Sequence, residues 1–175
     1  YDQDVEEGHK RVGLGLEASA AILDFNYNHY QKATNQKVIS GTKEQVLSGQ
    51  EYNISSQVPF IPWTTFNFQG YRMENELAAQ DIKGNIYSLE MALSPSLDFD
   101  ILKDDSSVNG QESEWEYRLT FVHPPRENKP NLLANGISSD LAFEKKNMKA
   151  ALKEKVRRNN NLAVEIQGSV IFTSK

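Results

Sequence analysis

The feature that most constrains this chain is an alternation of apolar and polar residues, with a period of two, that recurs from residue 9 to residue 144. Successive side chains of a β-strand point to opposite faces, so the alternation predicts strands with one apolar and one polar face. Such strands form antiparallel sheets. The predicted strands are residues 9–22, 23–28, 52–60, 66–69, 87–93, 97–101 and 115–121, with an eighth candidate at 137–144.

The connections between these strands alternate in length. Short turns are predicted at residues 21–24, 59–63 and 94–96, and long polar connections at residues 31–50, 74–84 and 103–113. Outer-membrane β-barrels have short periplasmic turns and longer extracellular loops, so this order is typical of them. We therefore expect an all-β, antiparallel transmembrane β-barrel with its short turns in the periplasm. By this parity the first strand runs away from an outside loop, and we expect strands before Tyr1 or a reduced barrel of about eight strands.

The two faces of the predicted strands have different chemistry. In a membrane barrel the apolar face meets lipid, and aromatic residues form girdles at the two interfaces. Aromatic residues near the strand ends are Tyr27, Tyr30, Tyr52, Phe60, Trp63, Tyr71, Tyr87, Trp115 and Tyr117. The polar face would line the lumen, and we expect Glu90, Asp98, Asp100, Glu116 and Arg118 there. The same alternation also fits a soluble sandwich or small barrel whose polar face meets water.

Composition excludes several classes of protein. No apolar run approaches the roughly 18 residues of a transmembrane helix, and the absence of cysteine excludes disulfide scaffolds, cysteine-ligated zinc and thiol nucleophiles. The net charge of −5 argues against nucleic acid as a partner. The three histidines have no metal-binding spacing, the acidic run at 98–110 lacks the positions of a calcium loop, and no GxSxG motif occurs. We predict no catalytic residue, metal or cofactor, and no enzymatic activity.

The C-terminal part of the chain has a different composition. Residues 145–158, KKNMKAALKEKVRR, are rich in good helix formers and carry seven basic residues against one acidic residue. Asn159, Asn160 and Asn161 would end this helix, after which residues 162–172 alternate again. Attraction to the acidic lumen residues is a physical reason for the basic helix to lie at or in the pore.

Four stretches of the chain resemble one known family. They are RVGLGLEAS (11–19), FIPWTTFNFQGY (60–71), ALSPSLDFDI (92–101) and, most specifically, VRRNNNLAVEI (156–166). They resemble the membrane domain of intimin- and invasin-type adhesins, the inverse autotransporters. The resemblance implies a barrel at 1–144, a periplasmic or pore helix at 145–158, and a linker at 159–175 toward a C-terminal passenger. It assigns Arg157, Arg158, Asn159, Asn160 and Asn161 to the pore helix and linker.

The resemblance also implies a function. Such a domain anchors the protein in the bacterial outer membrane and displays the passenger on the cell surface for adhesion to host cells. The implied partners are outer-membrane lipid, the chain's own passenger, the barrel-assembly machinery and a host-cell receptor. The family barrel has twelve strands, more than the seven or eight predicted here. The alternatives are a small porin-like barrel without a passenger and a soluble β-barrel binding module such as a lipocalin-like carrier.

Overall fold

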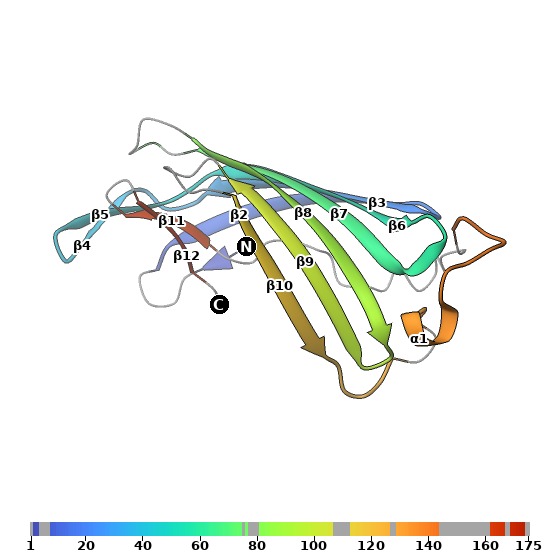
Figure 1. The fold of residues 1–175 in the computed structure, drawn as a ribbon. Helices are drawn as coiled ribbons and strands as arrows, with labels where there is room; N and C mark the ends of the chain where they lie inside the picture. Colours follow the sequence, from blue (N-terminus) through green and yellow to red (C-terminus); the bar gives the residue numbers. More distant parts are fainter. Residues whose placement is uncertain are drawn as a thin grey trace.

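The computed structural model describes residues 2–3, 8–74, 76, 81–106, 113–126, 129–143, 162–166 and 169–173. This part of the chain is almost entirely strand (Figure 1). Its elements are β1 (Asp2–Gln3), β2 (Lys10–Ser19), β3 (Leu23–Lys32), β4 (Lys37–Ile39), β5 (Thr42–Val46), β6 (Gly49–Val58), β7 (Ile61–Met73), β8 (Ile82–Ser94), β9 (Leu97–Ser106), β10 (Glu114–Phe121), α1 (Leu132–Asn135), β11 (Leu162–Ile166) and β12 (Ser169–Thr173).

The main sheet has the order β1-β2-β3-β6-β7-β8-β9-β10, and every neighbouring pair is antiparallel. The prediction of an antiparallel all-β fold is therefore confirmed, and each of the seven predicted strands is present. Within the described residues the sheet is open: β10 has only β9 as a partner, and β1 covers β2 only at Lys10 and Arg11. No helix of the described residues is long and apolar enough to cross a membrane.

Several strands run further than the alternation predicted. β8 already begins at Ile82, and β9 continues to Ser106, through residues that the sequence assigned to long connections. At the end of β9 both faces are polar, as in the run Lys103, Asp104 and Asp105. Alternation detects a strand only where one face is apolar and the other is not.

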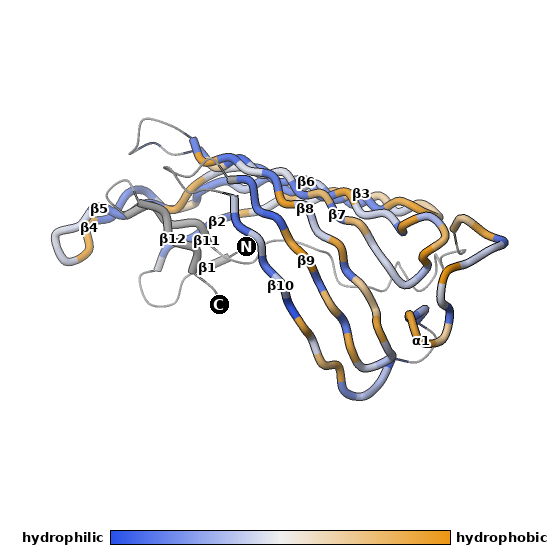
Figure 2. Tube along the Cα trace, viewed as in Figure 1, coloured by the Kyte–Doolittle hydropathy of each residue, from blue (hydrophilic) through white to orange (hydrophobic). Residues whose placement is uncertain are grey.

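The apolar face of the main sheet is the exposed one, and on the polar face the side chains of β3 and β6 are largely buried. Leu14 and Leu119 are 77% and 66% exposed, whereas Asn28 and Glu51 are 3% and 4% exposed. Figure 2 shows hydrophobic and hydrophilic residues alternating along the strands. This is the reverse of a water-soluble protein, in which exposed apolar surface is confined to small patches.

A second, smaller sheet has the order β12-β11-β5-β4. β4 and β5 form a hairpin inside the connection between β3 and β6, which the sequence analysis predicted only as a long polar connection. β11 and β12 come from the C-terminal part of the chain. In Figure 1 this sheet lies at one end of the main sheet, and α1 lies at the other. We call these the loop end and the turn end, because the short β2–β3, β6–β7 and β8–β9 turns lie with α1.

The predicted eighth strand, residues 137–144, is wrong. Within the described residues 137–143 the chain forms bends, preceded by α1. These bends are held against the β6–β7 turn, where the amide of Phe60 donates to the carbonyl of Ala142 (2.7 Å) and its carbonyl accepts from the amide of Ser138 (2.8 Å). The indole Nε1 of Trp63 also donates to the carbonyl of Gly136 (2.7 Å). These backbone groups therefore bond to a turn instead of to a strand partner.

Candidate functional site

The candidate site is the polar face of the main sheet. Strand register brings three of the predicted lumen residues into one row, because Glu90 of β8 pairs with Asp100 of β9 and Asp100 pairs with Arg118 of β10. Asp98 and Glu116 lie on the same face, each two residues along the strand from Asp100 and Arg118, respectively. Asp98 pairs with Thr120, and Glu116 pairs with Leu102. The sequence therefore identified a set of side chains that share one face.

Two ion pairs organise the charges of this group. Arg118 Nη2 lies 2.6 Å from Glu116 Oε1 on the same strand. Asp98 is paired with Arg126, which comes from the segment that follows β10, and this pair is largely shielded from solvent. The second pair ties residues after the last strand to the polar face near the turn end, where Arg126 N also donates to the carbonyl of Pro95 (2.9 Å).

A hydrogen-bond chain crosses the polar face between β2 and β6. Asn26 Nδ2 donates to Glu17 Oε1 (2.9 Å), and Asn28 Nδ2 donates to Asn26 Oδ1 (2.7 Å). Asn28 also donates to Glu51 Oε1 (3.1 Å), which accepts from the hydroxyl of Tyr30 as well. The buried side chains of this row are thus held by one another, as buried polar groups must be.

A second set of hydrogen bonds lies on the same face of β6, β7 and β8. Ser55 Oγ donates to Asn67 Oδ1 (2.5 Å), and Asn67 Nδ2 donates to Ser88 Oγ of β8 (3.3 Å). The polar face is therefore a continuous wall of hydroxyl, amide and carboxylate groups. Such a wall can hydrogen-bond to the backbone of an extended segment, which an apolar wall cannot do.

The polar face changes character at the loop end, where an apolar cluster closes over it. Tyr30, Met73 and Ile82 lie there in or beside one register row, and Leu47 packs against them from the residues that follow β5. The guanidinium of Arg11, also buried, lies 3.9 Å from the centre of the Tyr30 ring. The base of the β4–β5 hairpin is therefore part of a small core.

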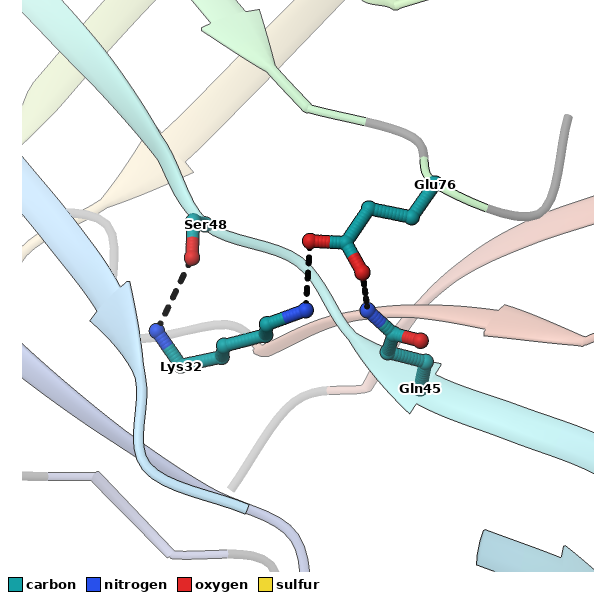
Figure 3. Close-up of polar contacts among 4 residues, drawn as sticks. All are labelled: Lys32, Gln45, Ser48 and Glu76. Carbon is teal, nitrogen blue, oxygen red and sulfur yellow. Dashed lines mark hydrogen bonds and ion pairs between the residues drawn. The ribbon is translucent and has the colours of Figure 1, made fainter. Parts of the chain in front are cut away.

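Polar contacts also hold β5 to the main sheet (Figure 3). Gln45 Nε2 donates to Glu76 Oε2 (2.9 Å), and Lys32 Nζ lies 2.5 Å from Glu76 Oε1. The Lys32 amide donates to Ser48 Oγ (3.0 Å). Hydrogen bonds from Lys32 and Gln45 hold the pKa of Glu76 below its usual range. His9, directly before β2, also approaches β5: its Nε2 lies 3.5 Å from Glu44 Oε2.

Comparison with known families shows to which kind of protein this sheet belongs. Residues 1–160 match the family described as "Inverse autotransporter, beta-domain". The chain belongs to the inverse autotransporter β-domain family. Among proteins with curated descriptions, none is significantly similar to it. A solved structure from a study of the in-meso crystallization of membrane proteins has the same fold, with a TM-score of 0.68 and 14% identity, over 94% of this chain and 70% of that chain.

Membership of the inverse autotransporters explains the reversed faces. These β-domains are anchors and translocators of the bacterial outer membrane, so the exposed apolar face is the one that meets lipid. The soluble sandwich or binding module considered from the sequence is therefore wrong. The exposed face includes Val12, Leu14, Leu16, Phe66, Leu89, Tyr117, Leu119 and Phe121.

The other predicted site residues of this inverse autotransporter lie outside the described part of the structure. These are the helix 145–158 and the residues Arg157, Arg158, Asn159, Asn160 and Asn161. Sequence reasoning missed the loop-end contacts made by His9, Arg11, Glu44, Gln45 and Glu76. One feature of the sequence could have predicted the hairpin that carries Glu44 and Gln45. It is the Ser-Gly pair at 40–41 between two short β-prone runs, which is typical of a hairpin turn.

Proposed function

We propose that this domain is the outer-membrane anchor and translocator of an intimin/invasin-type adhesin, and that it displays a C-terminal passenger on the cell surface for adhesion to host cells. In this proposal the loop end faces outward and the turn end faces the periplasm. The domain contributes no enzymatic chemistry. Lipid surrounds the apolar face, the barrel-assembly machinery inserts the strands, and the passenger binds a host-cell receptor.

The observation that carries this proposal is the position of the chain before and after residues 144–161. Ala142 is bonded to the β6–β7 turn at the turn end, whereas Val164 of β11 pairs with Val46 of β5 at the loop end. The chain therefore moves from one end of the sheet to the other between these two points. The predicted helix 145–158 would cover about 21 Å at about 1.5 Å per residue, and the residues on either side of it, extended at about 3.3 Å per residue, would add a similar length. Together they can span the length of the 13-residue strand β7.

The chemistry of the polar face also supports passage of the chain. An extended segment crossing a membrane must find partners for its backbone groups, and the wall built by Asn28, Ser55 and Asn67 offers donors and acceptors. The acidic side chains Glu90 and Asp100 complement the basic composition of residues 145–158. A pore that only excluded water would need neither feature.

The proposal is tested with the full-length protein in its outer membrane. Membrane fractionation, a heat-modifiable band on cold SDS gels and protease treatment of intact cells are measured together. We expect outer-membrane recovery, a heat-dependent shift and protease-sensitive material C-terminal to Lys175 on the outside. A folded outer-membrane barrel with no surface-exposed C-terminal material would overturn the translocator function, and would fit the porin-like alternative.

A further inference from the structure

The β4–β5 hairpin places a strand edge at the loop end of the sheet. β4 pairs with one side of β5, through Lys37 to Ile39. The other side pairs antiparallel with β11, in the register Val46–Val164, Gln45–Glu165 and Glu44–Ile166. β12 then continues the sheet beyond β11. The β4–β5 hairpin and the β11–β12 pair are far apart in the sequence, and within the described residues the pairing of β5 with β11 joins them into one sheet.

The hairpin is fixed in place by contacts that do not involve the C-terminal strands. Leu47, directly after β5, is fully buried and belongs to the apolar cluster of the main sheet. Gln45 is bonded to Glu76, which Lys32 also holds, and Glu44 lies beside the buried His9. These partners are His9 directly before β2, Lys32 of β3, Glu76 of the β7–β8 connection and the apolar cluster. None of them belongs to the C-terminal strands, so β5 has contacts of its own that can hold it without residues 162–166.

A strand edge that is fixed in advance is a binding site for an extended chain. Its unpaired backbone groups bond to an incoming strand, which is the mode of recognition called β-augmentation. Only the incoming segment loses conformational freedom, because the edge is already ordered, and preorganisation of this kind strengthens binding. The partner that fits is an extended segment with alternating side chains, which residues 162–166 are.

We propose that β5 is a docking edge that captures the C-terminal segment of the chain as it emerges from the pore. Residues 162–166 bind to β5 first, which fixes their register, and residues 169–173 then fold back onto them. The first two strands outside the membrane thus form on a template that belongs to the barrel domain. This inference rests on the proposed translocator function and names the site that receives the exported chain.

Cysteine cross-linking in intact cells tests the docked state, since the chain has no cysteine of its own. Gln45→Cys is combined with Glu165→Cys, its register partner, whose Cα lies within disulfide range. The control combines Gln45→Cys with Val170→Cys, which pairs with Glu165 and so lies two strands from Gln45, beyond that range. We expect a disulfide in the first pair and none in the control. Surface-displayed passenger without the first disulfide would overturn the inference.

Export kinetics test whether the edge acts during translocation. Gln45→Pro removes a backbone donor from β5, whereas Gln45→Ala loses the contact with Glu76 but keeps the backbone edge. Val38→Pro places the same residue in β4, which does not touch β11. We expect Gln45→Pro to slow the surface appearance of the passenger about tenfold and Gln45→Ala to slow it less, because only the side-chain contact with Glu76 is lost. The control Val38→Pro should stay within about twofold of the parent.

Heat-modifiable mobility and the export rate of the parent protein distinguish failure of the docking inference from failure of the proposed function. Heat-modifiable mobility shows which variants carry a folded barrel, and only those are compared. If Gln45→Pro and Val38→Pro export the passenger at the parent rate, the docking inference is wrong while the translocator function stands. If the parent protein exports no passenger, the proposed function is wrong and the docking inference fails with it.

Discussion

Tyr71 of β7 lies across Gly84, its register partner on β8, so closely that a Cβ on Gly84 would stand 2.5 Å from the tyrosine hydroxyl oxygen. Tyr52 lies over Gly70 in the same way on the opposite face of the sheet, with 2.4 Å to the ring carbon Cζ. In both pairs the missing side chain of glycine leaves the space that a large ring fills on the neighbouring strand. Glycine in a strand often marks such a close approach.

Replacing Gly84 by alanine should therefore destabilise the barrel. The added methyl group forces the ring of Tyr71 to move, and overpacking of this kind costs about 1–3 kcal/mol. Urea unfolding of the refolded domain in lipid vesicles measures the loss. The double variant Gly84→Ala/Tyr71→Ala should be less damaged than the sum of the two single variants, because the ring is absent. Additive losses would show that the ring does not need the space.

Glu51 joins the hydrogen-bond chain of the polar face, so its removal should be costly. Glu51→Ala leaves the Asn28 amide and the Tyr30 hydroxyl without their shared acceptor in a buried position. We expect a loss of about 1–3 kcal/mol in unfolding free energy. Glu114→Ala, at an exposed position of β10, is the matched control and should change it by less than about 0.5 kcal/mol. Equal effects of the two substitutions would contradict the network.

The faces of the main strands could be predicted because their residues alternate strictly. The row of Glu90, Asp100 and Arg118 follows from strand order and register, and the sequence had already placed these residues on one face. The polar–apolar contrast is strong there because one side meets lipid and the other does not. The positions of Arg157 and Arg158 in a pore helix stay a prediction.

The remaining features depend on contacts between distant residues. The burial of His9 and Arg11 comes from packing against Glu44 and Tyr30, and no local pattern announces it. The helix α1 was missed because it has only four residues, although Asn131 caps it by accepting from the Ala134 amide. Residues 137–143 alternate weakly, but their backbone groups are taken by the β6–β7 turn.

The attachment of the β4–β5 hairpin should weaken in acid. Hydrogen bonds from Lys32 and Gln45 lower the pKa of Glu76 below its unfolded value of about 4.3. The contact therefore contributes stability above that value and loses it as the pH falls through the lowered pKa. Hydrogen exchange of residues 42–46 between about pH 6 and pH 3, corrected for the intrinsic rate, should show increasing opening at the acid end. Glu76→Gln should remove this acid-induced increase in hydrogen exchange. If the variant shows the same increase as the parent, the acid sensitivity does not come from Glu76.

Adjacent residues of β8 should respond differently to the same substitution. Leu89 lies between Phe66 and Ile101 in the apolar face, so Leu89→Arg should cost about 2–4 kcal/mol in a bilayer. Glu90→Arg places the same side chain beside Asp100 on the polar face, and we expect a cost below about 1 kcal/mol. Folding into vesicles, followed by the heat-modifiable band, compares the two. A larger loss for Glu90→Arg would reverse the assignment of the faces.

Charge reversal tests the predicted basic pore helix. We expect Arg157→Glu combined with Arg158→Glu to reduce surface display of the passenger, because the acidic residues of the polar face would then repel the segment. Arg157→Lys combined with Arg158→Lys, which keeps both positive charges, is the control and should leave display unchanged. Flow cytometry of an epitope on the passenger gives the amount displayed. Unchanged display in the double variant would contradict a role for these two arginines.

In the proposed function the chain passes from the periplasmic turn end to the outer loop end. Labelling of intact cells with a membrane-impermeant maleimide tests it, using full-length protein with single cysteines at Ala21→Cys in the β2–β3 turn, Lys43→Cys in β5 and Thr173→Cys in β12. We predict that Lys43→Cys and Thr173→Cys are labelled on intact cells, and that Ala21→Cys is labelled only after permeabilisation. Two results would contradict this path of the chain. One is that Lys43→Cys is labelled on intact cells but Thr173→Cys is not, and the other is that Ala21→Cys is labelled on intact cells.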